Sequence, residues 1–372
     1  MTETNRNGEP GYSCDVACRA AHDGRRSAKR SRKMKTAQIA TLIVLLTTSV
    51  LAWAAEPWPA EAWTAVETLT HHDPGFKKNM SGACYNPTTD VFWVCCNGGP
   101  SAFWALKKDK KGNWGIAVEG GKQARFDVGQ GDLEDICQVD YRKDLVYLIA
   151  EGEDKIREYD ASHYGKATLL SEWNISAHVP TKGGEGSEGI TFVPDEWLKK
   201  GNFTDADGKP CMSKGGMGGL MFVAHQNGGR IYVFDLGAKR KEVRFIGSYK
   251  TSREESSGLA FDRSSGLLYI WHNTGPNYLE VATLSSSMDG KERRFSLVTE
   301  FVGPKGGNLE GIAVSPATTK DGLCLIVDDD NQDGAAIMLF KHFDFSKIPG
   351  RDAAEQPLSP GVDKGKSVPT AE

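Results

Sequence analysis

The chain has 372 residues, of which 39% are hydrophobic and 25% are charged, and its formal charge at pH 7 is −4. This composition is typical of a globular protein with one large domain or two small ones, and the mildly acidic balance argues against nucleic acid as a macromolecular partner. The 42 glycines favour strands and turns over helices.

The N-terminal segment differs from the rest of the sequence. Residues 1–33 form a basic extension, which we interpret as an over-called start or an extended leader. Residues 34–54 have the pattern of a signal peptide, because a basic start is followed by an apolar stretch and by small residues around Trp53. This predicts a periplasmic or secreted protein. The alternative is an uncleaved membrane anchor, since about 18 apolar residues nearly span a bilayer.

A short motif then recurs along the chain, with serine or glutamate followed in most copies by glycine and an apolar run. The copies are NMSGACYN (79–86), DLEDICQV (132–139), GSEGITFV (186–193), SSGLAFD (256–262) and NLEGIAV (308–314). Each is followed by a second apolar strand: VFWVCC (91–96), LVYLIAE (145–151), LMFVAHQ (220–226), LLYIWHN (267–273) and LCLIVDD (323–329). Repeats of this length with short strands predict an all-β fold, a β-propeller of four-stranded antiparallel blades over residues 58–348.

The repeat count gives five blades, with six as the alternative if a degenerate unit lies near 160–185. The last unit has three strands, and we expect WTAVETLT (63–70) to supply the fourth and close the ring. The segment 195–219 is interpreted as an inserted loop. The polar tail, residues 349–372, is predicted to be disordered.

Six cysteines remain after the leader, and an exported chain can oxidise them. A disulfide between Cys84 and either Cys95 or Cys96 is one hypothesis, and buried thiols on strands are the other.

The repeated motif places one polar side chain per blade at the same mouth of the central channel. These residues are Ser81, Glu134, Glu188, Ser257 and Glu310. Three carboxylates brought together raise one another's pKa unless a cation lies between them. Oxygen ligands in this number suit calcium, which takes six to eight of them. The sequence therefore predicts a central Ca²⁺ ion as the cofactor.

The loops between the second and third strands should emerge at the same mouth. Candidate proton carriers for catalysis in these loops are Glu151, His225, His272 and Asp328. Candidate substrate-binding residues are Lys155, Arg230, Asn273 and Asn331. The alternative is that polar residues are common in hairpin loops.

The ring order, from Ser81 to Glu310, resembles the central calcium ligands of the five-bladed calcium-activated apyrases, which hydrolyse nucleotide di- and triphosphates. The pair NLEGI (308–312) and VDDDN (327–331) is similar to the closing signature of the phytase-like extracytoplasmic propellers. The sequence departs from the apyrases at Cys95-Cys96-Asn97-Gly98-Gly99, where that family carries an acidic pair and an arginine.

Two functions fit these features. The first is a calcium-dependent hydrolase of phosphorylated or ester substrates, which resembles the phytase-like and apyrase-like enzymes. The second is a non-catalytic propeller that binds a small molecule or a protein and contains a structural calcium ion. In both cases we expect a monomer, with membrane contact only if the leader stays uncleaved.

Overall fold

A computed structural model describes residues 54–350, except for 78, 130, 181–185, 240–241, 319–321 and 331–333. The extension 1–33 and almost all of the predicted leader 34–54 and tail 349–372 lie outside the described residues.

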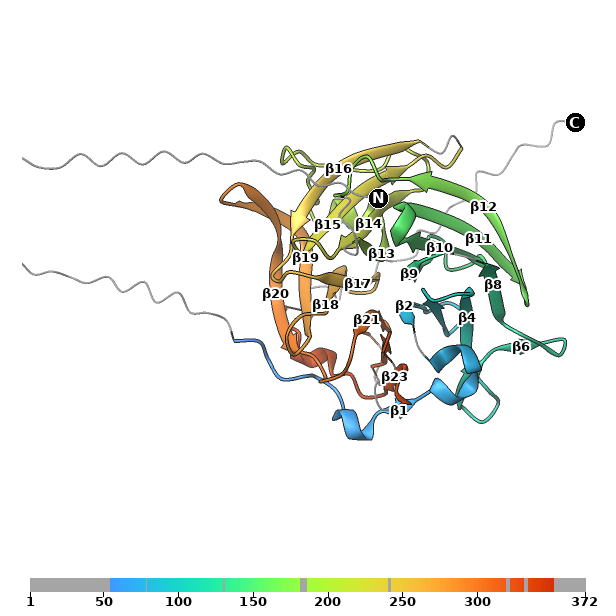
Figure 1. The fold of residues 1–372 in the computed structure, drawn as a ribbon. Helices are drawn as coiled ribbons and strands as arrows, with labels where there is room; N and C mark the ends of the chain where they lie inside the picture. The colour runs from blue at the N-terminus through green and yellow to red at the C-terminus, as the bar shows by residue number, and fades with distance from the viewer. Residues whose placement is uncertain are drawn as a thin grey trace, which may run out of the picture. The chain divides into compact units, whose positions relative to one another are not determined.

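The described residues are nearly all β-strand, in antiparallel sheets that follow one another along the chain (Figure 1). One sheet contains β2 (Met80–Asn86), β3 (Val91–Cys96), β4 (Ser101–Lys108), β5 (Trp114–Ile116) and β8 (Arg125–Gly129). The next contains β9 (Leu133–Cys137), β10 (Leu145–Ala150), β11 (Lys155–His163) and β12 (Lys166–Asn174). A small hairpin, β6 (Val118–Glu119) with β7 (Lys122–Gln123), lies between β5 and β8 in sequence.

Two further meanders are joined into one eight-stranded sheet. The first has β13 (Ser187–Pro194), β14 (Gly219–His225), β15 (Arg230–Leu236) and β16 (Val243–Lys250). The second has β17 (Ser256–Asp262), β18 (Leu267–His272), β19 (Tyr278–Asp289) and β20 (Glu292–Val302). They meet through one parallel pair, Lys250 with Arg294.

The last sheet contains the first and the last strands of the described chain. It is formed by β21 (Leu309–Val314), β22 (Cys324–Asp328), β23 (Ile337–Phe340) and β1 (Glu67–Thr68). As the sequence predicted, the N-terminal strand completes this sheet, since Glu67 pairs with Leu339 and Thr68 with Met338 (Figure 1). Only two residues are extended, because Trp63–Ala65 and Thr70–His72 are 3₁₀ turns.

The innermost strands of the sheets form a closed ring. β2 contacts β9, β9 contacts β13, β13 contacts β17, β17 contacts β21, and β21 contacts β2. Figure 1 shows the meanders radiating from these strands. Antiparallel sheets placed around a central channel are the arrangement of a β-propeller.

Side chains between neighbouring sheets supply the core. Five buried apolar clusters occur among the described residues, each built from the facing strands of two adjacent sheets or, in the eight-stranded sheet, of its two meanders. Strands in the interior of a sheet are covered on both faces, which is why the second strands β3 and β14 are buried at every residue. The outer strand β12 is mostly exposed or half-buried. Continuous apolar runs are therefore expected in the covered strands and not in the outer ones.

The inserted segment after β13 contains a helix that the sequence analysis treated as loop. This helix, α1 (Asp195–Lys200), has acids in its first turn and lysines in its last, which suits the helix dipole. It buries Trp197 and Leu198 in the cluster between the meanders that begin with β13 and β17. Within the described residues, no helix is long and apolar enough to cross a membrane.

The six described cysteines are free thiols, and all except Cys84 are buried. The structure therefore agrees with the hypothesis of buried thiols rather than with a disulfide of Cys84.

Candidate functional site

The five motif residues lie at the start of the five inner strands and are buried. Their exposed fractions are 1% for Ser81, 3% for Glu134, 4% for Glu188, 2% for Ser257 and 6% for Glu310.

A β-bulge occurs at the motif position in every inner strand. In β2, for example, Met80 pairs with Cys96 and Gly82 with Cys95, so Ser81 is an extra residue without a cross-strand partner. The strand register shifts in the same way at the other four positions. A bulge redirects a side chain out of the regular alternation of a strand. This local irregularity accounts for a polar side chain at the start of an otherwise buried apolar strand.

The glycine that follows the motif residue allows neighbouring inner strands to approach closely. A Cβ atom on Gly311 would lie 2.5 Å from the carbonyl oxygen of Ser81, and one on Gly258 would lie 2.5 Å from that of Glu310. A Cβ on Gly189 would lie 2.4 Å from the carbonyl oxygen of Ser257. Only glycine fits these contacts. The repeated glycine therefore indicates that the inner strands lie close together around a narrow channel.

One serine hydroxyl joins two of the ring carboxylates. Ser81 Oγ lies 2.8 Å from Glu134 Oε2 and 2.7 Å from Glu310 Oε2. A hydroxyl has a single proton to donate. Only one of these contacts can therefore be a hydrogen bond from serine to an ionised carboxylate, and the other requires a protonated carboxyl group or a cation.

The remaining two ring positions differ from this arrangement. Ser257 Oγ is buried and has no hydrogen-bond partner among the described residues. The carboxyl group of Glu188 is hydrogen-bonded to that of Glu151, which is also hydrogen-bonded to Asp132. Two carboxyl groups can share a hydrogen bond only if one of them holds a proton.

Further oxygen-bearing side chains surround the ring. Oxygen atoms from Asp132, Glu134 and Glu151 lie within 4.8 Å of one another. Asn308 Nδ2 donates to Glu310 Oε1 at 2.6 Å and lies 3.3 Å from Asp329 Oδ2. The sequence analysis identified Glu151 but missed Asp132 and Asn308, although each stands two residues before a motif glutamate.

Burial and like charge together raise the pKa values of the ring carboxyl groups. Burial raises the pKa of Glu134 to about 8, with repulsion from Asp132 and Glu151 adding to the effect and the Ser81 hydrogen bond opposing it. Burial raises the pKa values of Glu188 and Glu310 well above their usual range, and the charge on Glu134 raises both further. Three anions are therefore unfavourable here without a compensating cation.

These shifts predict how the metal-free protein responds to pH. The folded state retains a proton on Glu134 that the unfolded state releases near pH 4.5, so stability should fall as pH rises from about 5 to about 8. One pKa unit corresponds to about 1.36 kcal/mol, so the loss is on the order of 4 kcal/mol. Urea unfolding of the calcium-depleted protein at pH 5 and at pH 8 measures this loss of stability. Equal stability at pH 5 and pH 8 would contradict the prediction.

The basic residues near this mouth are already paired with acids. Lys155 Nζ lies 2.7 Å from Glu153 Oε2 and 3.0 Å from Glu172 Oε1, and Arg230 pairs with Glu292. Among the described residues, no lysine or arginine forms an ion pair with a ring glutamate. The predicted substrate-binding roles of Lys155 and Arg230 would thus require these ion pairs to open.

The two histidines proposed as proton carriers are fully buried. His225 Nδ1 accepts the Asn227 N–H at 3.0 Å, and Nε2 then donates to the carbonyl of Pro180 at 3.0 Å. His272 lies 3.4 Å from Ser256 Oγ through Nδ1 and 3.0 Å from Glu280 Oε2 through Nε2. Because both nitrogens of each ring are engaged, these contacts favour a structural role for both histidines.

The three remaining predicted site residues are Asp328, Asn273 and Asn331. Asp328 is buried and accepts the N–H of Asp330 at 3.0 Å, which holds the loop after β22. Asn273 Nδ2 donates to Asn308 Oδ1, so the structure brings it to the edge of the ring. Asn331 lies outside the described residues.

Asp135, directly after Glu134, is a buried residue that the sequence analysis missed. It is fully buried, and its Oδ1 accepts the N–H groups of Ala83 at 3.0 Å and Ile136 at 2.8 Å. Its Oδ2 accepts the N–H of Ile190 at 2.8 Å, and the N–H of Leu259 also bonds to this carboxylate. Burial raises the pKa of Asp135, and these N–H donors oppose the shift. One carboxylate thus joins four inner strands below the ring.

None of the known protein-family models matches this chain, and no curated protein matches it. Among solved structures, it is similar to a protein from Lactobacillus plantarum, with 13% sequence identity and a TM-score of 0.35. The match covers 68% of this chain and 60% of the other.

Proposed function

We propose that the chain is an exported five-bladed β-propeller that binds one calcium ion at the ring of Ser81, Glu134, Glu188, Ser257 and Glu310. The observation that carries the proposal is the contact of Ser81 with two buried carboxylates, within a set of three that has no basic partner among the described residues. A divalent cation would remove most of the repulsion that raises their pKa values.

The chemistry of the donors fits calcium. The ring offers carboxylate and hydroxyl oxygens, with no sulfur or imidazole ligand, and calcium accepts six to eight such oxygens in flexible geometry. Ser257 Oγ is a buried polar atom without a hydrogen-bond partner among the described residues. Such burial is unfavourable unless a bound ligand interacts with the oxygen.

The count of five blades is supported by two independent features. Five inner strands contact one another in a closed cycle, and five apolar clusters separate neighbouring sheets in the described part of the chain. The parallel pair Lys250–Arg294 belongs in this interpretation to a contact between two neighbouring blades.

Calorimetric titration of calcium into depleted protein tests the site. We expect one calcium per chain and a melting temperature that rises with calcium. At 100 times the dissociation constant the stabilisation should be about 2.7 kcal/mol. Magnesium should bind more weakly, because it requires a stricter octahedron. Absence of calcium binding together with an unchanged melting temperature would contradict the proposal.

A second candidate function, calcium-dependent hydrolysis of phosphorylated or ester substrates, is favoured by Glu151. This side chain is half-buried and hydrogen-bonded to both Glu188 and Asp132. Burial raises its pKa, with the charge on Asp132 adding to the shift, so it can hold or accept a proton beside the ring. A bound calcium ion would supply Lewis acidity toward a substrate oxygen. A phytase-like or apyrase-like activity would use these groups.

Turnover of nucleotides, phytate, lactones and aryl esters with and without calcium tests this second function. The variant Glu151→Gln should lose turnover and keep calcium binding, since Glu151 lies beside the ring positions and not among them. If the wild-type protein binds calcium and turns over none of these substrates, the non-catalytic binding propeller is the better description.

A further inference from the structure

A cavity of about 240 Å³ opens at the other mouth of the central channel. Its walls come from the second halves of β2, β9, β13, β17 and β21 and from the loops that follow, including Cys84, Cys137, Thr191, Phe261 and Val314. The motif residues that form the ring are the second residues of the same strands. The two sites are thus at opposite ends of the inner strands, and the cavity is independent of the proposed calcium site.

The lining of this cavity is mainly apolar, and several polar groups in its wall are bonded within the protein. Gln138 accepts from Asn86 Nδ2 at 2.8 Å and donates to the carbonyls of Lys143 and Leu145. Asp262 accepts from Ser264, Ser265 and the N–H of Ala317. These groups are poorly placed to recognise a ligand, because their hydrogen-bonding capacity is used.

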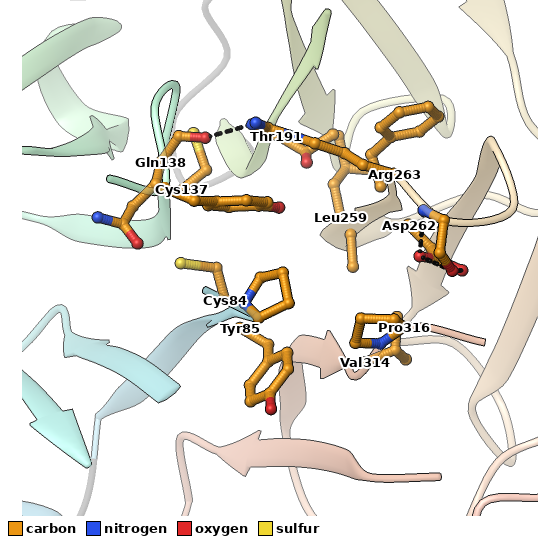
Figure 2. Close-up of a pocket in the computed structure, with 15 residues that line it drawn as sticks. Cys84, Tyr85, Cys137, Gln138, Thr191, Leu259, Asp262, Arg263, Val314 and Pro316 are labelled. Carbon is orange, nitrogen blue, oxygen red and sulfur yellow. Dashed lines mark hydrogen bonds between the residues drawn. The ribbon is translucent and has the colours of Figure 1, made fainter. Parts of the chain in front are cut away.

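Arg263 is the exception in this wall. Its side chain crosses one side of the cavity, where Nη1 donates to Val139 O at 3.0 Å and Nη2 to Gln138 O at 2.7 Å (Figure 2). The guanidinium lies over the ring of Tyr141, with Cζ 3.9 Å from the ring centroid. A guanidinium has five N–H donors, so N–H groups remain after these two hydrogen bonds are made.

The charge of Arg263 is not neutralised by a carboxylate. Among the described residues it forms no ion pair, and its Nε is buried without a hydrogen-bond partner. Carbonyl oxygens and an aromatic face solvate a guanidinium but leave its net charge. Burial raises the pKa values of Cys84, Cys137 and Tyr141, with the charge of Asp135 adding to the rise for the two thiols, and the positive charge of Arg263 opposes the rise in all three.

We propose that this cavity binds a small organic carboxylate, with its charge beside Arg263 and its apolar part against Leu259, Val314 and Pro316. Figure 2 shows these three residues on the side of the opening opposite Cys84 and Cys137. Ligand pockets usually have volumes of about 300 Å³ or more, so the ligand is small. Carboxylates are preferred as the anion because guanidinium and carboxylate groups match in plane and charge.

Calorimetry with benzoate as the probe, and benzamide as its neutral analogue, tests the proposal on the full chain. Benzoate should bind, and benzamide should bind about tenfold to a hundredfold more weakly, because the analogue lacks a charge-assisted bond. Calcium depletion should leave benzoate affinity unchanged if the protein stays folded. Failure of benzoate to bind, or equal affinity for both probes, would overturn the proposal.

Two variants locate the bound probe. Arg263→Gln should reduce benzoate affinity to that of benzamide, but it also removes the bonds to Val139 and Gln138 and so can weaken the fold. Cys84→Leu adds volume to the cavity wall and leaves Arg263 intact, so it should reduce the affinity for both probes. If a folded Cys84→Leu protein bound benzoate as tightly as wild type, the carboxylate would not lie in this cavity.

Discussion

Replacing Asp135 by alanine is expected to reduce the free energy of unfolding by on the order of 5 kcal/mol. The carboxylate accepts N–H groups from Ala83 and Ile190 and also binds the N–H of Leu259, three strands that lie far apart in sequence. Alanine would leave these N–H groups buried and unpaired, at about 1–3 kcal/mol each. Since whole domains are stable by only about 5–15 kcal/mol, this single change should bring the protein close to unfolding. Urea denaturation followed by tryptophan fluorescence measures the loss.

Two comparisons separate this effect from a general loss of charge. Asp135→Asn keeps one oxygen acceptor and should fall between wild type and alanine. Asp127→Ala removes an exposed aspartate that pairs with Arg125 at the surface, and it should cost less than about 1 kcal/mol. A loss below about 1 kcal/mol for Asp135→Ala would show that the carboxylate does not hold the inner strands together.

The β-propeller fold and the positions of the ring residues could be predicted because they repeat. A single serine or glutamate before an apolar strand, such as Glu310, is an ordinary turn residue. The same residue type in phase with four other copies marks one place in every sheet, and the structure puts all five at the starts of the inner strands. Closure by β1 was predictable for a related reason, since the last repeat lacked one strand and an unpaired edge is unfavourable.

The contacts that are not repeated could not be predicted. Asp135 breaks the motif, because it stands where the other copies have glycine, and only the folded structure shows that its carboxylate occupies the channel. His225 and His272 looked like loop residues with available nitrogens, whereas each is the last residue of a buried strand. Lys155 is neutralised by Glu172 from the neighbouring strand, a pairing that depends on strand register.

Replacing Glu134 by glutamine is expected to change stability in opposite directions with and without calcium. Without calcium at pH 8, the variant should be more stable than wild type by a few kcal/mol, because a buried carboxylate is replaced by a neutral group of the same shape. At pH 5 the gain should vanish, since Glu134 is then protonated in the folded state. With calcium the variant should be less stable than wild type, and its calcium affinity should fall about tenfold or more, because affinity depends on the charge of the ligands.

This reversal of sign distinguishes a cation site from a structural cluster of acids. If Glu134 served only to accept hydrogen bonds from Ser81 and Asn97, the glutamine variant would be slightly destabilised under all conditions, and calcium would not matter. Glu196→Gln is the matched control, since this carboxylate is exposed on α1 and its removal should not alter the response to calcium. If calcium raises the melting temperature of the wild type and leaves that of Glu134→Gln unchanged, the ion is bound at the ring.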